Sequence, residues 1–172
     1  MGLAASSFHD DSSNQRSRAA SNSNGRKPKP GAAKTLKFTI PSEYEAGRDV
    51  QKQILDEVKR NGFNAQNEFA IKLALEEGLI NAIKHGNRLD AAKKVHIEVK
   101  VSPAKFEISI EDEGPGFVRT AVPDPTLDEN LDKCSGRGIL LMESYMSSVK
   151  YSNKGRRVTM TKKNEPDVHP RK

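Results

Sequence analysis

Residues 94–116 read KVHIEVKVSPAKFEISIEDEGPG, and this stretch decides the fold. Apolar and polar residues alternate on both sides of a turn at residues 102–105, which is the side-chain period of a strand that buries one face. The pattern predicts an antiparallel hairpin with one face on a core and the other in solvent. The apolar positions are Val95, Ile97, Val99 and Val101 before the turn, and Phe106, Ile108 and Ile110 after it.

The chain ahead of the hairpin predicts a strand followed directly by a helix. Apolar residues alternate over positions 36–40 before Pro41, as in a short strand. Ser42 and Glu45 have the spacing of a capping box at a helix start. An apolar stripe then continues to residues 61–62, where Asn-Gly indicates the helix end.

A second helix is expected to begin near Asn67 and to stop around residues 85–87. Its apolar residues, Phe69 among them, occur on more than one side of the helix. We therefore expect this helix to be well buried.

The chain after the hairpin predicts a long loop and a second, smaller helix and hairpin. Residues 113–135 contain several prolines and few apolar side chains, and they are too many for an ordinary connection, so we interpret them as a lid. A short helix should open at residues 136–138, and strands near 149–151 and 158–160 should meet at a turn. The predicted fold class is α+β, a two-layer sandwich with helices on one face of a mostly antiparallel sheet.

Composition and charge restrict the class of protein. With 172 residues, the chain is expected to form one compact domain over residues 34–163. Residues 1–33 lack an apolar period and predict a disordered basic tail, and 164–172 predict a second disordered tail. The net charge of +6 lies in residues 1–34 and 161–172, because residues 35–160 carry equal numbers of acidic and basic side chains. This distribution argues against direct binding of nucleic acid.

The cellular location is expected to be cytoplasmic. Cys134 is the single cysteine, which fits a reducing compartment. The sequence has no apolar run long enough to span a bilayer and no apolar stretch of the signal-peptide type at its start. We therefore expect no association with membranes.

The first candidate motif is Glu77-Gly78-Leu79-Ile80-Asn81 in the second predicted helix. A spacing of four places Glu77 and Asn81 on one helix face, one turn apart, among apolar neighbours. An amide oxygen is a suitable ligand for Mg²⁺, and a carboxylate can take a proton from a hydroxyl group or water. An exposed helix edge without any function would show the same pattern.

The second candidate motif is Asp112-Glu113-Gly114-Pro115-Gly116, which follows the hairpin. A carboxylate at a strand end can accept a hydrogen bond from an exocyclic amine, and glycines let a flat ring approach the backbone. A tight turn needs the same glycines, so this pattern alone leaves both interpretations open.

The third candidate motif is Gly136-Arg137-Gly138 at the start of a helix, where free backbone N–H groups favour phosphates. A glycine hinge is the alternative. The sequence has neither the P-loop pattern nor the motifs of eukaryotic-type protein kinases, which excludes the two commonest ATP-binding architectures.

Taken in order, the three motifs resemble the GHKL (Bergerat-fold) ATP-binding domain over residues 35–163, and within it the anti-sigma-factor serine kinases. The shared features are Glu-x-x-x-Asn on a helix, Asp-x-Gly-x-Gly after a hairpin, a proline-bearing lid and Gly-x-Gly on a helix. Further stretches similar to that subgroup are Pro123-Asp124-Pro125, residues 136–142 and Val149-Lys150-Tyr151.

The resemblance implies a role for each matching position. It implies Asn81 as the ligand of Mg²⁺ and Glu77 as the base that activates the acceptor hydroxyl group. Glu76, next to Glu77, points about a third of a turn away and is expected to be solvated. The adenine amino group would bind to Asp112.

The glycines have implied places around the nucleotide. Gly114 and Gly116 would lie beside the adenine ring. The phosphate side would be lined by Gly136, Arg137 and Gly138. One departure concerns the last strand, where the family usually has Gly-Thr and this chain has Gly155-Arg156, which leaves the threonine's contact near adenine without an equivalent.

The function implied by the resemblance is that of a serine/threonine kinase that binds Mg-ATP, sequesters a sigma factor and phosphorylates a small antagonist protein. A homodimer is also implied. Two other interpretations remain open: a nucleotide-gated binding module without phosphotransfer, and the detached ATPase domain of a histidine kinase. The helix before Glu77 contains no histidine, so no phosphoacceptor hairpin accompanies the site.

Overall fold

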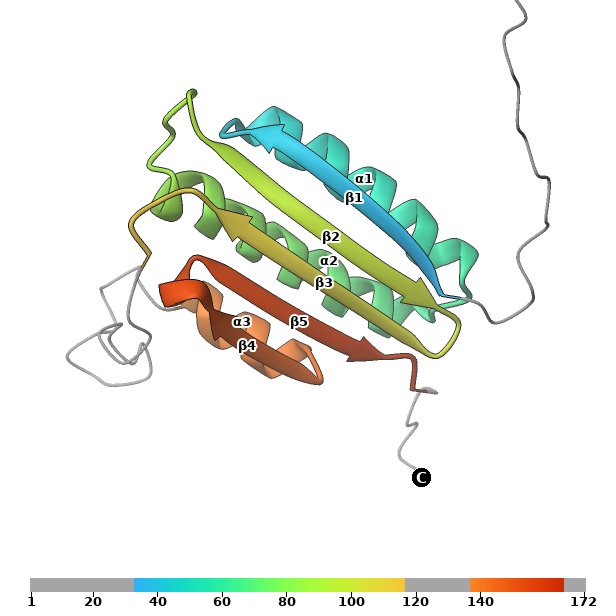
Figure 1. Ribbon diagram of the computed structural model, residues 1–172. Coiled ribbons are helices and arrows are strands. Elements are labelled where there is room, and N and C mark those ends of the chain that lie inside the picture. The colour runs from blue at the N-terminus through green and yellow to red at the C-terminus, as the bar shows by residue number, and fades with distance from the viewer. Residues whose placement is uncertain (1–32, 117–136, 166–172) are drawn as a thin grey trace, which may run out of the picture.

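The computed structural model describes residues 33–116 and 137–165, which form a five-stranded sheet covered on one face by helices (Figure 1). Neighbouring strands are antiparallel, and their order is β1-β2-β3-β5-β4. The predicted α+β sandwich is therefore confirmed. The strands are β1 (Lys34–Pro41), β2 (Lys94–Ser102), β3 (Lys105–Asp112), β4 (Ser148–Ser152) and β5 (Arg157–Lys163).

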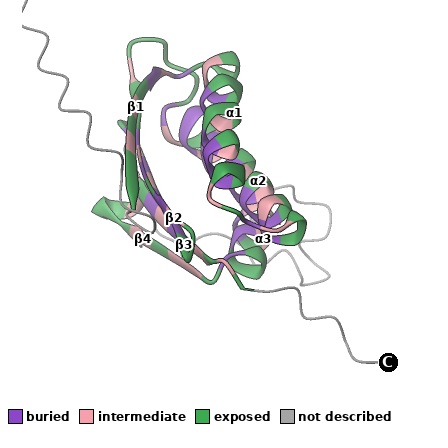
Figure 2. Cartoon of the chain, turned by 90° about the vertical axis from the view of Figure 1, so that its right-hand side faces the viewer, coloured by how far each residue is buried: buried purple, intermediate pink, exposed green. Residues whose placement is uncertain are grey.

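Three α-helices and two short turns complete the described part of the chain. The helices lie behind the sheet in the view of Figure 1, and Figure 2 shows that their buried positions lie on the side turned to the sheet. Within residues 33–116 and 137–165, none of the helices combines the length and apolarity that crossing a bilayer requires. The elements are α1 (Tyr44–Arg60), α2 (Ala65–Ile80), the π-helical turn η1 (Asn81–Gly86), α3 (Arg137–Tyr145) and the 3-10 turn η4 (Asn153–Gly155).

The central hairpin has the predicted register. Ser102 lies opposite Lys105, so a two-residue turn joins β2 and β3. The alternating apolar side chains of both strands are buried against the helices, whereas His96, Glu98 and Lys100 lie on the open face. The turn and the alternation together fix which face of the sheet meets the helices.

The predicted capping box at α1 is wrong. The helix begins at Tyr44 and its N-cap residue, Glu43, makes no side-chain cap. Ser42 is buried, and its hydroxyl group donates a hydrogen bond of 2.9 Å to the carbonyl oxygen of Lys93. The Ser42 hydroxyl group, which the sequence pattern predicted to cap α1, instead forms a tertiary contact with the residue that precedes β2.

Helix α2 packs closely on the sheet through Gly78. A Cβ atom at this position would lie 2.9 Å from Ile110 Cδ1 and 3.1 Å from Met160 Cε, so a larger residue would move the helix away from the strands. The helix begins at Ala65, two residues before the predicted start, because the side chain of Asn64 caps it by accepting from Asn67 N at 2.8 Å. The close packing sets the position of both site residues that flank Gly78.

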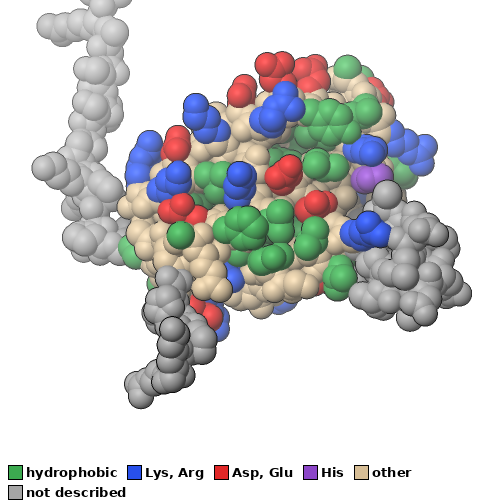
Figure 3. Space-filling model, turned by 180° about the vertical axis from the view of Figure 1, so that it is seen from behind, with side chains coloured by type: hydrophobic (Ala, Val, Ile, Leu, Met, Phe, Trp, Pro, Cys, Tyr) green, Lys and Arg blue, Asp and Glu red, His purple; other side chains and the backbone are tan. Residues whose placement is uncertain are grey.

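Helix α2 is well buried, as expected, with seven of its residues buried, but Phe69 lies on its outer side. This side chain is 55% exposed and packs edge-to-face on Tyr145 of α3, with ring centroids 5.9 Å apart. The sheet, α1 and α3 cover the other sides of α2, and its outer side remains open. Figure 3 shows this helical face, on which apolar side chains lie among charged ones.

Residues 164 and 165, which follow β5, form hydrogen bonds with the rest of the domain. Asn164 donates through Nδ2 to Gly62 O at 3.1 Å and to Pro103 O at 2.8 Å, and its N–H bonds Ala104 O at 2.9 Å. The carbonyl oxygen of Glu165 accepts from Asn67 Nδ2 at 2.8 Å. These bonds join the end of β5 to the α1–α2 connection and to the central hairpin. Most of the predicted lid, and Gly136, lie outside the described residues.

Candidate functional site

A pocket of about 520 Å³ opens between α2 with η1, the ends of β3 and β5, and the start of α3. A second hollow, of about 400 Å³, lies on the open face of the sheet among ion-paired side chains. The first pocket is the candidate site, because it brings together residues of all three predicted motifs. These residues are Glu77, Asn81, Asp112, Gly116 and Gly138.

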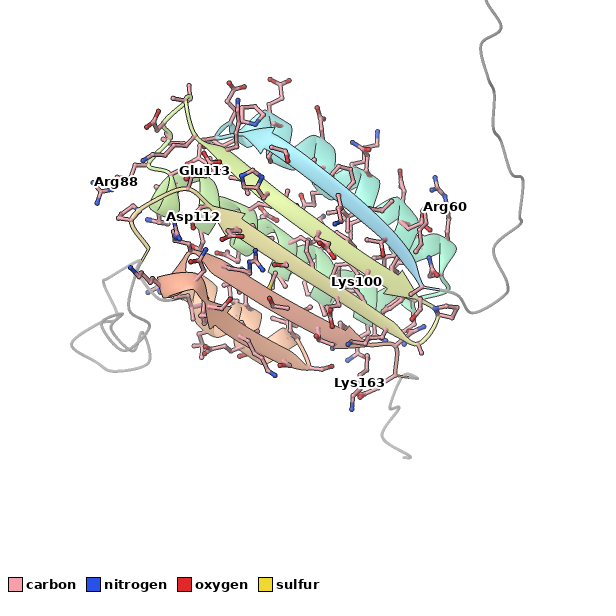
Figure 4. The ribbon with its side chains drawn as sticks, viewed as in Figure 1. Arg60, Arg88, Lys100, Asp112, Glu113 and Lys163 are labelled. Carbon is pink, nitrogen blue, oxygen red and sulfur yellow. The ribbon has the colours of Figure 1, made fainter. Side chains whose placement is uncertain are left out.

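Asp112 ends β3 and presents a buried carboxyl group to the pocket. Its Oδ1 accepts a hydrogen bond of 2.8 Å from Gly114 N. Burial raises the pKa of Asp112, and the bond from Gly114 and the charge of Arg156 oppose this effect. Figure 4 shows Asp112 and Glu113 at the same end of the sheet, opposite the end that carries Arg60 and Lys163.

Two glycines make room for this carboxyl group. A Cβ atom at Gly86, the last residue of η1, would overlap the Asp112 carboxyl group, and one at Gly114 would overlap Gly86 O. The end of η1 and the end of β3 are therefore in backbone contact. Gly114 belongs to this contact behind the pocket rather than to its lining.

Asn87 fixes the same end of the sheet. Its side chain is fully buried; Nδ2 donates to Ser42 Oγ and to Lys94 O, both at 2.8 Å, and Oδ1 accepts from Glu113 N at 2.7 Å. These three bonds tie the start of α1, the start of β2 and the end of β3 together. The position of Asp112 follows from them, since Glu113 is its neighbour in the chain.

Glu113 itself points away from the pocket to the open end of the sheet. Its carboxylate accepts from Lys94 N at 2.9 Å, and its Oε1 lies 2.8 Å from His96 Nε2. The backbone bond from Lys94 and the contact with His96 lower the pKa of Glu113. This side chain therefore supports the strand ends and does not line the site.

Glu77 lies near the C-terminal end of α2, half-buried, with its carboxylate against the first turn of α3. A Cβ atom at Gly138 would overlap Glu77 Oε2, so glycine is needed there for close approach. Burial, and after it the negative charge of Glu76, raise the pKa of Glu77. Glu76 is exposed, as predicted.

Asn81 stands where the α-helix becomes a π-helix. It is the C-cap residue of α2, and its backbone N–H donates to both Glu77 O and Gly78 O. Its side chain is half-buried and lines the pocket. The wider turn that follows is closed by the bond from Asn87 N to Ala82 O, 2.8 Å long. Isolated π-helical turns occur frequently at functional sites.

The remaining predicted residues occupy different places. Gly116 lines the pocket with a φ of +82°, and a Cβ atom there would overlap Lys154 O in the turn between β4 and β5. Arg137 begins α3 with an exposed side chain. Gly136 precedes the described residues.

Sequence reasoning missed two residues that shape the pocket. Gly86 was interpreted only as a helix end, and Arg156 only as a departure from a family pattern, yet both line the pocket. Glycine is needed at position 86 because the end of β3, with Asp112, lies against it, and this contact is visible only in the folded structure. The apolar wall comes from residues that also belong to the core or its edge: Ile110, Ile139, Met142 and Val158.

The residues that line the pocket differ in chemistry along α2 and η1. The buried Asp112 lies beside Gly86, whereas Glu77, with Asn81 one turn on, lies earlier along the helix. Gly86 follows Glu77 by nine positions along α2 and the π-helical turn η1, a rise on the order of 10 Å. An extended nucleotide spans a length of this order, with an apolar wall for its base and polar groups for its phosphates, so the residues fit such a ligand.

Known proteins resemble this chain in sequence and in fold. A family model described as histidine kinase-like ATPase domain matches residues 40–162. The anti-sigma F factor of Clostridium perfringens is 37% identical over 99 residues, which cover 54% of this chain and 70% of that protein. The serine-protein kinase RsbW of Bacillus subtilis is 26% identical over 136 residues, which cover 74% of this chain and 84% of that kinase.

The structural comparison shows the same fold. A crystal structure of the RsbU and RsbW domains of a Mycobacterium tuberculosis protein aligns with a TM-score of 0.52 and 16% identity. The alignment covers 76% of this chain and 31% of that longer chain. Because the family model covers well over half of its residues, this chain belongs to the histidine kinase-like ATPase domain family.

Proposed function

We propose that this chain is an ATP-dependent protein serine/threonine kinase of the anti-sigma type. It binds Mg-ATP, holds a sigma factor, and phosphorylates a small antagonist protein. The observation that carries the proposal is that Glu77, Asn81 and Asp112, from two separate motifs, line one pocket. The names of the relatives, an anti-sigma F factor and serine-protein kinases, supply the class of partner and of acceptor.

The base is held at the Asp112 end of the pocket. An ionised carboxylate accepts a hydrogen bond from the 6-amino group of adenine, and Gly114 N holds that carboxylate in place. Ile110 and Val158 give the ring an apolar wall. Guanine presents an acceptor oxygen at the same position, so this end of the pocket selects adenine.

The metal and the phosphates belong at the opposite end. Mg²⁺ usually keeps several waters and is held by one or two protein oxygens together with substrate phosphates, so the Oδ1 atom of Asn81 suffices as a ligand from this helix. Lys84 and His85 also line the pocket, and Gly138 opens the first turn of α3. Backbone N–H groups at a helix start favour phosphate oxygens.

Glu77 acts on the acceptor. When bound, Mg-ATP supplies the phosphoryl group that is transferred. The ionised Glu77 carboxylate accepts the proton of a serine or threonine hydroxyl group. At the same time the hydroxyl oxygen of the acceptor forms a bond to the γ-phosphorus, and the bond between that phosphorus and the leaving ADP oxygen breaks. The pKa of Glu77, raised by burial and by Glu76, makes it a stronger base than an ordinary glutamate.

The test is transfer from labelled ATP to a small partner that co-purifies with the chain from its native host. We expect Mg²⁺-dependent labelling of the partner on a serine or threonine, which survives acid treatment, and the labelled site can be mapped by mass spectrometry. An acid-labile label would indicate a phosphohistidine and the histidine-kinase alternative. ATP binding without any transfer to a partner whose complex is verified would overturn the kinase and favour the nucleotide-gated binding module.

A further inference from the structure

Arg156 is placed opposite Asp112 across two strands. The register pairs Glu111 with Arg157, and the next step of that antiparallel pairing brings Asp112 N within 3.1 Å of Arg156 O. Successive side chains of a strand point to opposite faces. Arg157 forms an ion pair with Glu111 on the open face, whereas Arg156, which directly precedes β5, lines the same pocket as Asp112.

The guanidinium group of Arg156 is held in place by Asn153. Arg156 NH2 donates to Asn153 Oδ1 at 2.7 Å, and Nε donates to Asn153 O at 3.3 Å. Asn153 is itself fixed by a bond from its Nδ2 to the Glu111 carboxylate. A side chain anchored in this way loses little further freedom when it contacts a ligand.

The turn that carries Arg156 has an uncommon backbone. Asn153, Lys154 and Gly155 all have positive φ angles, of 51°, 57° and 84°. Left-handed non-glycine residues cost free energy and are found preferentially at binding sites. The turn also packs on Gly116, since a Cβ atom there would lie 3.3 Å from Arg156 Cγ. The stem of Arg156 and Gly116 together form the rim of the pocket next to Asp112.

The positive charge of Arg156 affects Asp112 electrostatically, while the hydrogen bonds of its guanidinium group are made to Asn153. The charge lowers the pKa of Asp112 in opposition to burial, and the strongest bond to the carboxyl group comes from Gly114. The pocket-facing side of the Asp112 carboxyl group is thus left for a ligand, with a planar cation beside it.

We propose that Arg156 stacks its guanidinium plane on the face of the purine whose amino edge Asp112 binds. The inference rests on the proposed function, and it assigns Arg156 to the base rather than to the phosphates. Arginine suits this role because its planar, weakly hydrated cation stacks on aromatic faces, which the point charge of lysine does not reproduce. Nucleobases are known to stack on arginine planes in the same way.

The experiment compares nucleotide binding by calorimetry in wild type, Arg156→Ala, Arg156→Lys and the matched control Arg157→Ala. The probes are ATP with Mg²⁺, adenosine and inorganic triphosphate. We expect Arg156→Ala to weaken ATP and adenosine binding by the same factor, roughly tenfold, with triphosphate binding unchanged. Arg156→Lys should recover little of the loss, and Arg157→Ala, whose side chain lies on the open face, should bind all three probes as wild type does.

Three results would overturn the inference. Unchanged ATP affinity in Arg156→Ala would make the side chain a bystander, and a loss confined to triphosphate would make it a phosphate ligand. Full recovery by Arg156→Lys would assign the effect to charge rather than to stacking. Circular dichroism and a thermal melt establish that each variant is folded. If wild type itself binds no ATP, the proposed function fails first, which distinguishes the two failures.

Discussion

The carboxyl group of Asp112 occupies the space that a side chain at Gly86 would need. Residue 86 ends η1 and residue 112 ends β3, so the contact joins the helical layer to the sheet at the floor of the pocket. The glycine is required here for room and not for backbone conformation, because its φ is not positive. The position of the Asp112 carboxyl group therefore requires a residue without a Cβ atom at position 86.

Gly86→Ala is the first test of this contact. The added methyl group must displace the Asp112 carboxylate or the end of η1, and we expect ATP affinity to fall by roughly tenfold or more, as for the loss of a charged hydrogen bond. Calorimetry with Mg-ATP measures the effect. Gly47→Ala is the matched control, since its new Cβ atom would meet the end of the flexible Ile83 side chain at 3.1 Å and Leu79 Cβ at an ordinary contact distance of 4.0 Å. Equal affinities in the two variants would separate Gly86 from the site.

Asp112→Asn should separate stability from binding. The amide can present a donor to the adenine amine, and loss of the charged bond should weaken ATP binding about tenfold to a hundredfold, or roughly 1.5–3 kcal/mol. Because burial raises the pKa of Asp112, its ionised form destabilises the folded state above that pKa, and the cost disappears as pH falls through it. At neutral pH the neutral variant should therefore melt no lower than wild type. Asp90→Asn, at an exposed site, is the control for both measurements.

Asn87→Ala should destabilise the domain. The truncation removes three hydrogen bonds, one buried and two part-buried, and leaves Lys94 O and Glu113 N without their partner, a loss of roughly 2–4 kcal/mol. Urea unfolding followed by circular dichroism measures it. Ser42→Ala removes one of the linked groups and should cost less than half as much. A change of less than about 0.5 kcal/mol in the free energy of unfolding of Asn87→Ala would show that water replaces the three hydrogen bonds of the Asn87 side chain.

The pH dependence of phosphotransfer should report the environment of Glu77. A base must be ionised to act, so the rate falls on the acidic side as Glu77 becomes protonated. Its pKa is raised by burial and then by Glu76, so the fall should begin at a higher pH than for an ordinary glutamate. Glu76→Gln removes the second cause and should move the acidic limb to lower pH in single-turnover assays. Glu68→Gln, more than two turns earlier on α2, should leave it in place.

The sequence predicted those parts of the fold that depend on local periodicity. The hairpin from Lys94 to Asp112 and the final strand pair follow from alternation and turn residues, and both are present. The capping box at Ser42 failed because a contact between residues distant in the chain took the hydroxyl group. Helix α2 is well buried, as its apolar residues on more than one side indicated, but periodicity does not show which neighbours cover each side, and Phe69 remains exposed.

The site shows the same division. Glu77, Asn81 and Asp112 could be proposed from residue type and spacing, and the structure places all three in one pocket. The π-helical turn after Asn81 and the contact of Gly86 with Asp112 arise only when helix and strand ends meet, so no local pattern announces them. Arg156 was visible as an unusual residue, but its position opposite Asp112 follows from strand register.

Glu77 and Asn81 share one helix face and one pocket, yet the proposed mechanism gives them separable functions. Glu77→Gln keeps the shape of the side chain and removes the base, so Mg-ATP binding should stay close to wild type while phosphotransfer falls by roughly 10²–10⁴-fold. Asn81→Ala removes the metal ligand and should weaken Mg²⁺-dependent nucleotide binding and phosphotransfer together. Direct binding and labelled-ATP transfer to the verified partner, measured side by side, distinguish the two patterns.

The control for this pair is Glu76→Gln, which changes the same chemical group at the adjacent, exposed position. At neutral pH it should transfer phosphate at the wild-type rate, because its side chain is directed away from the pocket lining. Weak nucleotide binding in Glu77→Gln would assign Glu77 to metal or phosphate binding instead. Full transfer by Glu77→Gln would exclude it as the base, since no glutamine can accept the hydroxyl proton, and the kinase mechanism would then need another group beside Gly138.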